Sequence, residues 1–509
     1  MLLGCVDKMF TKTGRCTVTS ATLSGVEAVP VTVEVVVSEG MPAFHVVGMP
    51  DISIREAFER IKAACKACGF RMPDLHVVVN LAPSSIKKAG SGFDLPIALA
   101  LLGATDQISK RHIANSVVVG ELSLDGHVRP VPGQLAFALC ARSLNADFIC
   151  SDEESGAVRI DGLQSYCVSS LSNFREEELN EAMVKTQAPQ PSVADFRDIA
   201  GHDVAKRALQ IAAAGGHGVL MMGPPGSGKT MLASRLPSIL PPLTEREKLE
   251  TAVIHSVVKE PVDAILGGVR PFRKPHHSAT LAGLVGGGNP VRPGEVTLAH
   301  NGVLFLDELS EFSPGVLQGI RQPMETGEVV LTRAEGAYRF PANFALIAAS
   351  NPCPCGYYGD DDHVCRCTVP QVRTYQNRIG GPIMDRIAIH LTIKRLSSSD
   401  VLNTGKGTSS QALREGVLMA REFASWRRSR QDLSADLGPT ERLLASCCMT
   451  DETREFLNAS AIVPNMSGRA IMSMLSIART VADLAESEQV MKPHLCEAMA
   501  LRVRDGDEI

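Results

Sequence analysis

The stretch Gly218–Thr230, G-V-L-M-M-G-P-P-G-S-G-K-T, decides the fold of the chain around it. An apolar run leads into the spacing G-x-x-x-x-G-K-T, which predicts a strand, a phosphate-binding loop and a helix whose N-terminus attracts anions. Lys229 is expected to reach the β- and γ-phosphates of a nucleotide, and the Thr230 hydroxyl to ligate Mg²⁺. A glycine-rich turn that bound nothing would give Lys and Thr no reason to follow the last glycine. The predicted loop comprises Gly223, Pro224, Pro225, Gly226, Ser227, Gly228, Lys229 and Thr230.

A second half of the same site is predicted at Gly302–Glu308, G-V-L-F-L-D-E. Four consecutive apolar residues are typical of a central strand in a parallel sheet, buried on both faces. The two carboxylates follow its C-terminal end, where open α/β sheets bind their ligands. Asp307 is expected to support the Mg²⁺ shell, and Glu308 to orient and polarise the attacking water. Both halves together predict a nucleotide-hydrolysing α/β domain.

Two more polar residues are predicted to join this site. The strand Ala345–Asn351 ends in an amide that can sense the γ-phosphate or position the water. Arg386 precedes another apolar strand, where an arginine can reach the γ-phosphate of a neighbouring subunit in a ring. The alternative for Arg386 is a local ion pair with Asp385.

The composition of the chain limits the number of its domains, the charge of its surface and the compartment in which it works. A chain of 509 residues exceeds one hydrophobic core and suggests about three domains. The formal net charge of −5 argues against a uniformly basic surface, so contacts with a polyanion must come from local patches. The first residues do not resemble a signal peptide, and no apolar run reaches the roughly eighteen residues of a spanning helix. Together with fourteen cysteines, most of them dispersed, this favours a cytoplasmic protein without a membrane partner.

Composition also divides the chain into segments. Residues 1–170 alternate β-rich and helical runs, with strands expected at Val29–Ser38 and His76–Leu81 and a helix at Ser53–Gly69. Residues 171–194 turn polar, acidic and proline-bearing, as linkers do. Residues 195–395 hold the nucleotide-site motifs. Residues 396–509 begin with a Ser/Gly-rich break and are predicted to be almost wholly helical.

Basic residues gather in two places near the site motifs. The stretch Arg270–Pro293 mixes cations with a glycine tract, and Glu328–Phe340 is predicted to be a hairpin. Flexible basic loops of this kind suit a phosphate backbone passing through a pore, although solvated surface charges are the alternative. The predicted contacts with DNA are Arg270, Arg273, Lys274, Arg292, Arg333 and Arg339.

Four cysteines follow Asn351 closely. They form two C-x-C pairs separated by a short loop, a set of thiols that can hold a structural zinc ion in tetrahedral geometry. Free thiols in a reducing compartment are the alternative, and His363 could replace one sulfur. The predicted zinc ligands are Cys353, Cys355, Cys365 and Cys367.

Two resemblances add residues to the site. The segment Asp195–His202 resembles the one that wraps the adenine base in AAA+ ATPases, which implies ATP as the nucleotide and places Ile199 and Gly201 against the ring. The helix predicted at Asn465–Ala485 has Ser467 as its cap, and Arg469 in its first turn matches the arginine of AAA+ lids that contacts the γ-phosphate.

The N-terminal segment resembles the Lon-type protease domain. The stretches N-L-A-P-S-S-I-K-K-A-G-S-G-F-D-L-P-I-A-L-A and V-V-V-G-E-L-S-L-D-G-H-V-R-P-V-P-G carry this likeness. The positions of the protease's serine and lysine fall at Asp94 and near Phe137, neither of which can do that chemistry. Ser91 and Lys87 remain as misaligned candidates. The resemblance therefore implies a non-proteolytic α+β domain that serves assembly or nucleic-acid contact.

Over its whole length the chain resembles the YifB/ComM-like branch of the magnesium-chelatase-related AAA+ family. The signatures include L-A-P-S-S-I-K-K, R-P-F-R-K-P-H-H-S-A-T, N-P-C-P-C-G and S-G-R-A. The resemblance implies a P-loop ATPase core between a Lon-like domain and a helical C-terminal lid. It further implies a homo-hexameric DNA helicase that drives branch migration of single-stranded or branched DNA during natural transformation, with a recombinase as a further partner. The alternative is a chelatase-like ATPase that remodels proteins without DNA motor activity.

Overall fold

The computed structural model divides into two compact units. The first twelve residues, most of the predicted linker and part of the Ser/Gly-rich break lie outside the described residues. The structure describes residues 13–152, 160–176, 179–181, 194–289, 291–333, 336–396, 407–431, 437–460 and 466–502.

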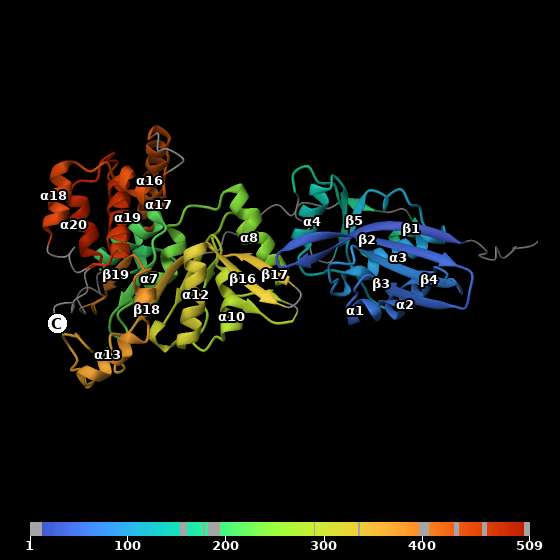
Figure 1. Ribbon diagram of the computed structural model, residues 1–509, viewed down its shortest axis with the longest axis horizontal. Coiled ribbons are helices and arrows are strands. Elements are labelled where there is room, and N and C mark those ends of the chain that lie inside the picture. Colours follow the sequence, from blue (N-terminus) through green and yellow to red (C-terminus); the bar gives the residue numbers. More distant parts are fainter. Residues whose placement is uncertain are drawn as a thin grey trace, which may run out of the picture. The chain divides into compact units, whose positions relative to one another are not determined.

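The first unit, built mainly from the N-terminal part, contains an eight-stranded mixed sheet in the order β10-β9-β8-β5-β1-β2-β4-β3 (Figure 1). Its helix α3 (Asp94–Ala104) is buried along its whole length, because its sequence is almost entirely apolar. The strands are β1 (Gly14–Ser24), β2 (Glu27–Ser38), β3 (Ala43–Val47), β4 (His76–Ala82), β5 (Ser116–Val118), β8 (Asp147–Ser151), β9 (Ser165–Val168) and β10 (Asn180–Glu181).

The predicted strands and helix of this segment are confirmed, with one break. The expected helix at 53–69 is two helices, α1 (Ile52–Arg55) and α2 (Ala57–Ala67), which meet at Glu56. The first residues of the segment predicted as a linker are folded. Leu171 and Phe174 are buried in the core of the first unit, and β10 pairs with β9, so these residues belong to the folded unit.

The second unit contains a five-stranded parallel sheet in the order β12-β15-β18-β11-β19. This arrangement confirms the predicted α/β core, and all four residues of β15 are buried, as expected for a central strand. The strands are β11 (Val219–Met222), β12 (Phe272–Arg273), β15 (Val303–Leu306), β18 (Ala345–Ser350) and β19 (Ile389–Thr392).

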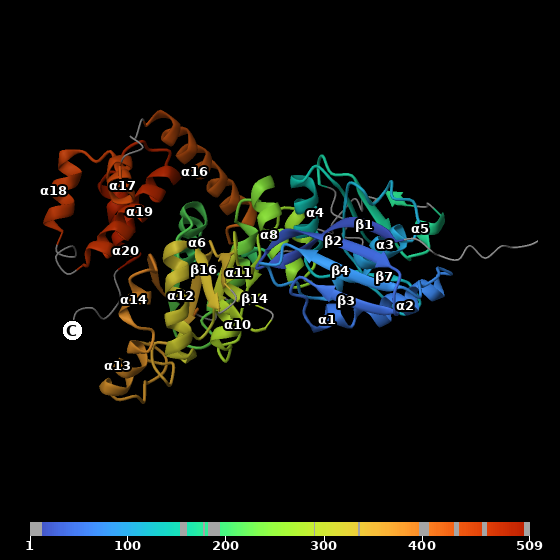
Figure 2. The same ribbon diagram turned by 45° about the vertical axis from the view of Figure 1, so that its right-hand side comes forward.

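The C-terminal helices share one hydrophobic core with this sheet. Val417 and Met474 belong to the same buried cluster as Val219 of β11, and both α16 and α19 pack against α6 (Figure 2). Ser467 caps α19 as predicted, since its hydroxyl accepts the Ala470 N–H. The helices of this unit include α6 (Asp203–Gly215), α7 (Lys229–Arg235), α12 (Pro314–Thr326), α13 (Val369–Asn377), α16 (Ser410–Arg430), α17 (Pro439–Cys447), α18 (Asp451–Ala459), α19 (Gly468–Leu484) and α20 (Lys492–Ala500).

The turn after α20 closes the outer side of β19. The Leu501 carbonyl accepts the His390 N–H at 2.7 Å, and the Arg502 guanidinium donates to the carbonyls of Ile387 and Ala388 at 3.1 and 2.9 Å. The edge strand of the sheet thus has hydrogen-bond partners on its outer side. None of the helices in the described parts of the chain is long and apolar enough to cross a membrane.

Candidate functional site

The phosphate-binding loop joins β11 to α7. Gly226 and Gly228 have φ angles of 77° and 85°, in the left-handed region where a side chain would be strained. A Cβ atom on Gly223 would lie 2.1 Å from the Ile393 carbonyl oxygen, so the loop has no room for one there. These glycines let the loop curl at the end of β11, and α7 begins at Lys229, as the sequence predicts.

Lys229 lies at the centre of the loop. Its Nζ donates to the carbonyls of Gly223 and Pro224 at 2.7 and 2.9 Å, and to Asn351 Oδ1 at 3.4 Å. Burial lowers the pKa of Lys229 to about 8, although the carboxylates of Asp307 and Glu308 act in the opposite direction. The lysine is therefore held in place by neutral carbonyls, which a phosphate group would outcompete as a partner.

The acid pair lies beside the loop. Strand β18 separates β15 from β11, so the residues at the ends of these three strands meet at one edge of the sheet. Thr230 Oγ1 donates to Asp307 Oδ2 at 3.0 Å, which brings together the two side chains predicted to hold Mg²⁺. Glu308 follows with a φ of 53°. A hydroxyl and a carboxylate in contact are a donor set that fits Mg²⁺.

Two further side chains bind the acid pair. Lys274 Nζ lies 2.9 Å from Asp307 Oδ2, and His277 Nδ1 lies 3.2 Å from Glu308 Oε2. The sequence predicts only that both residues belong to a basic stretch and that Lys274 contacts DNA. Both side chains reach the acid pair because β12, which ends just before them, lies next to β15 in the sheet, and the acid pair follows β15.

The other predicted DNA contacts differ in how accessible they are. Arg270 donates to Glu247 and to the Asn301 carbonyl, and Arg273 donates to both Glu295 oxygens at 2.7 and 2.9 Å. A role in DNA binding stays a prediction for these two and would require breaking the internal pairs. Arg292, Arg333 and Arg339 are exposed, and Arg339 pairs with Glu328 across the hairpin of β16 (Glu328–Arg333) and β17 (Gly336–Pro341).

The structure brings Arg386 and Arg469 to one carboxylate. Both guanidinium groups pair with Glu325 Oε1 on α12, the Arg469 contact measuring 3.0 Å. The hydrogen bond from Arg386 is the main cause of the lowered pKa of Glu325, and the hydrogen bond from Arg469 lowers it further. The alternative prediction, a local ion pair between Arg386 and Asp385, is wrong, because the Arg386 guanidinium pairs with Glu325. Glu325 was not singled out from the sequence, because nothing local marks it among the residues of an amphipathic helix.

The segment predicted to wrap the base lies close to the loop. Ile199 is buried, and its carbonyl accepts the Lys206 ammonium at 2.6 Å. Gly201 has a φ of 54° in the left-handed region. The neighbouring His202 has its Nε2 3.5 Å from the point where Gly228 would carry a Cβ, so this segment touches the start of α7.

Comparison with known proteins places this site in a family. Descriptions of magnesium chelatase match three successive parts: "Subunit ChlI of Mg-chelatase" residues 33–154, "Magnesium chelatase, subunit ChlI" residues 195–401, and "Magnesium chelatase, subunit ChlI C-terminal" residues 407–502. Uncharacterized protein YifB of Salmonella typhimurium is 39% identical over 494 residues, covering 94% of this chain and 96% of the relative. The chain belongs to the YifB/ComM-like family of magnesium-chelatase-related proteins. Competence protein ComM of Haemophilus influenzae is also 39% identical, over 490 residues, 94% of this chain and 95% of the relative.

A more distant likeness covers part of the chain. The Magnesium-chelatase 67 kDa subunit of Chlorobaculum parvum is 33% identical over 159 residues, which is 31% of this chain and 23% of that protein. The magnesium-chelatase domain of the YifB/ComM-like family is of the AAA+ type and implies ATPase activity. ATP and Mg²⁺ are the ligands that this activity implies, in agreement with the loop, the lysine and the acid pair.

The four predicted cysteines of this YifB/ComM-like chain form a compact cluster. Their sulfur atoms all lie within 4.8 Å of one another, and Cys353 Sγ lies 3.3 and 3.7 Å from those of Cys355 and Cys365. Sulfurs about 2.3 Å from a zinc ion in tetrahedral geometry are about 3.8 Å apart, so the cluster fits such an ion. Backbone N–H groups of Tyr357 and Arg366 lower the pKa of Cys355 to about 6, whereas the neighbouring thiols help to raise the pKa of Cys365 and Cys367, so the first thiolate of the cluster forms at Cys355.

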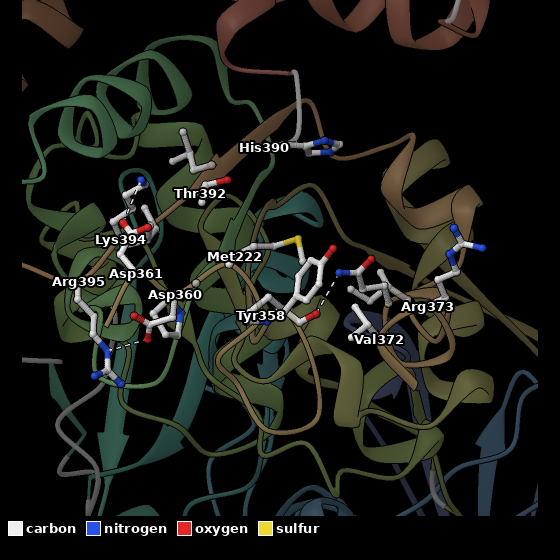
Figure 3. Close-up of a pocket in the computed structure, with 18 of the residues that line it drawn as sticks. Met222, Tyr358, Asp360, Asp361, Val372, Arg373, His390, Thr392, Lys394 and Arg395 are labelled. Atoms are coloured by element: carbon white, nitrogen blue, oxygen red, sulfur yellow. Dashed lines mark hydrogen bonds and ion pairs between the residues drawn. The ribbon is translucent and has the colours of Figure 1, made fainter. Parts of the chain in front are cut away.

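The cysteine loop is packed against the phosphate-binding loop. Arg395 donates to the Pro225 carbonyl at 3.1 Å, and its guanidinium lies 5.4 Å from the centre of the Tyr357 ring. A Cβ on Gly356 would come within 2.7 Å of Pro225. A cavity of about 410 Å³ lies between the two loops and β19, and Figure 3 shows Arg395 paired with Asp360 at its rim.

The N-terminal unit does not hold a serine–lysine pair at the aligned positions. Asp94 is buried and accepts two hydrogen bonds from Arg60, at 2.7 and 2.9 Å. Phe137 is buried in α4 (Gln134–Ser143). The misaligned candidate Ser91 donates its hydroxyl to Glu121. Asp94 is thus an internal ion-pair partner, and the absence of proteolytic activity in this domain stays a prediction.

Proposed function

We propose that this protein is an ATP-driven motor that moves on DNA and promotes branch migration when incoming single strands are recombined. The observation that carries the proposal is the assembled nucleotide site, in which Lys229 bonds Asn351 and Thr230 bonds Asp307. The chain that holds it is 39% identical to Competence protein ComM over 94% of its length. Exposed arginines on the β16–β17 hairpin supply cations suited to a phosphate backbone. We place it in a ring of six identical subunits in the cytoplasm, with single-stranded or branched DNA and a recombinase as partners.

The residues divide the hydrolysis of ATP among them. Lys229 neutralises the β- and γ-phosphates, and Asn351 orients the γ-phosphate or the water. Thr230 and Asp307 would hold Mg²⁺, which supplies charge neutralisation of the phosphate oxygens when bound. Glu308 orients the water that attacks the γ-phosphorus and accepts its proton, and the bond to the β-phosphate oxygen breaks, releasing ADP and phosphate. Arg386 of one subunit stabilises the charge that develops on the γ-phosphate bound in its neighbour, and Arg469 contacts the γ-phosphate.

The proposal is tested by ATP-driven strand displacement and branch migration on three-stranded and four-way DNA. The wild-type protein should move these junctions, and Lys229→Ala should abolish both nucleotide binding and movement. Glu308→Gln should keep ATP binding while hydrolysis falls by about 10²–10⁴-fold. ATPase activity that is intact and indifferent to DNA, without junction movement, would contradict the proposal and favour a protein-remodelling ATPase.

A further inference from the structure

We propose that the cysteine cluster is a modification site at which a hydroperoxide joins Cys355 and Cys365 in a disulfide bond, and that this bond weakens nucleotide binding. The cluster then makes the phosphate-binding loop sensitive to oxidants, in addition to stabilising that loop. The inference goes beyond the proposed function, because it concerns the binding of the nucleotide alone and requires no DNA.

Two of the thiols are both accessible and close together. Cys353 is fully buried, whereas Cys355, Cys365 and Cys367 are half-buried. The sulfur atoms of Cys355 and Cys365 lie 3.6 Å apart, so a bond between them requires only a local movement of the chain. Because both side chains are partly exposed, a small oxidant reaches this pair while the surrounding chain stays folded.

The reaction needs hydrogen peroxide and no other co-reactant. The Cys355 thiolate attacks one peroxide oxygen, the O–O bond breaks, and a sulfenic acid forms as hydroxide leaves. The Cys365 thiolate then attacks the Cys355 sulfur and displaces a second hydroxide, which completes the disulfide. The two sulfurs lose two electrons, and the two peroxide oxygens gain them. The new bond withdraws two of the four sulfurs that would hold a zinc ion.

The residues between the two thiols contact the phosphate-binding loop directly. A Cβ atom on Gly356 would lie 2.7 Å from the Pro225 ring, so no gap separates the two loops at this point. Arg395 donates to the Pro225 carbonyl and to His363 Nδ1, each at 3.1 Å, and thereby connects the far end of the same segment to Pro225. A displacement of the segment therefore moves Pro225.

A disulfide changes the shape of this segment. Bonded sulfurs are about 2.05 Å apart, so the two sulfur atoms must approach each other by roughly 1.5 Å. The segment has room to move, because its residues Tyr358 and Asp360 line the cavity of about 410 Å³ (Figure 3). Pro225 follows Pro224, whose carbonyl accepts the Lys229 ammonium at 2.9 Å. The movement therefore reaches the lysine that is predicted to bind the phosphates.

The test uses the full chain before and after treatment with hydrogen peroxide, and again after reduction by a thiol with added zinc. Three quantities are measured: zinc released to a chromophoric chelator, the disulfide by peptide mass spectrometry, and the Kd for ATP. Cys365→His is the informative variant, because an imidazole can replace a thiolate as a zinc ligand but cannot form the disulfide. The double variant Cys448→Ser/Cys496→Ser is the matched control, since both cysteines are exposed and lie outside the cluster.

We expect peroxide to join Cys355 to Cys365, to release about one zinc ion per chain and to raise the Kd for ATP about tenfold, as the loss of one hydrogen bond to a charged group would. Reduction with added zinc should restore the starting Kd. The control variant should respond as the wild type does, and Cys365→His should keep its zinc and its Kd in peroxide.

A wild-type Kd that peroxide leaves unchanged overturns the inference, whether or not the variant folds. A Kd that rises equally in Cys365→His also overturns it. Either result leaves the proposed function intact, because junction movement is measured without an oxidant.

Discussion

Lys229 illustrates how burial prepares a residue for its ligand. The free protein holds this ammonium with two carbonyls and an amide, all neutral, and burial brings its pKa down to about 8. A bound triphosphate favours the charged form, so it must raise that pKa again. Nucleotide binding above this pH therefore requires the uptake of a proton.

The first prediction concerns this proton. The affinity for ATP should be constant below about pH 7 and should fall by up to about tenfold per pH unit above pH 8, because the free protein then holds a neutral lysine that must be protonated. Calorimetry in two buffers of different ionisation enthalpy should show proton uptake at pH 8.5. Lys229→Arg, which cannot lose its proton, should show no uptake. Proton release, or an affinity that stays flat to pH 9.5, would contradict the assigned state of Lys229.

The residues of the site differ in how far sequence could predict them. The loop, Asp307, Glu308 and Asn351 were predictable because each lies within or directly after an apolar strand whose burial is a local property of the sequence. The contacts of Lys274 and His277 were not, since they depend on β12, a strand of only two residues, lying next to β15. The inward position of Arg270 likewise depends on Glu247, a partner that no local pattern specifies.

At the scale of elements, the cysteine loop and the phosphate-binding loop support each other. Arg395 and Gly356 connect the cysteine loop to Pro225, so the position of one loop affects the other. Structural zinc sites contribute directly to folding free energy. The cysteine cluster is therefore expected to support nucleotide binding by stabilising the phosphate-binding loop, without contacting the reacting atoms.

The second prediction follows from this connection. The purified protein should contain about one zinc ion per chain by elemental analysis. Cys353→Ser, or a chelator, should remove it, lower the thermal midpoint of the second unit and weaken ATP binding. Cys496→Ser changes an exposed cysteine outside the cluster and should leave all three quantities unchanged. A metal-free protein with full ATP affinity would show that the thiols are free.

On the scale of the whole molecule, the two arginines gathered at Glu325 raise the question of which subunit's nucleotide they serve. A ring with an arginine acting across each interface needs two intact subunits for each active site. Single subunits then carry incomplete sites that become complete on assembly.

The third prediction uses this dependence. Lys229→Ala and Arg386→Ala should each be inactive alone, but a mixed assembly should regain activity at about a quarter of its interfaces, where an intact Lys229 faces an intact Arg386. ATPase activity measured after mixing and reassembly would report the recovery. A mixture as inactive as its components would place Arg386 in the same subunit as the nucleotide it serves, or outside the chemistry.

The turn at Leu501 and Arg502 bears on how the molecule can be shortened. An uncovered edge strand offers its backbone to other chains, and β19 is an edge of the sheet. Removing the residues after α20 would take away the carbonyl that pairs with His390 and the guanidinium that binds Ile387 and Ala388. A fragment ending at residue 396 would also expose the face of α6 against which α16 and α19 pack. Such a fragment should aggregate, so a soluble minimal ATPase must extend through Arg502.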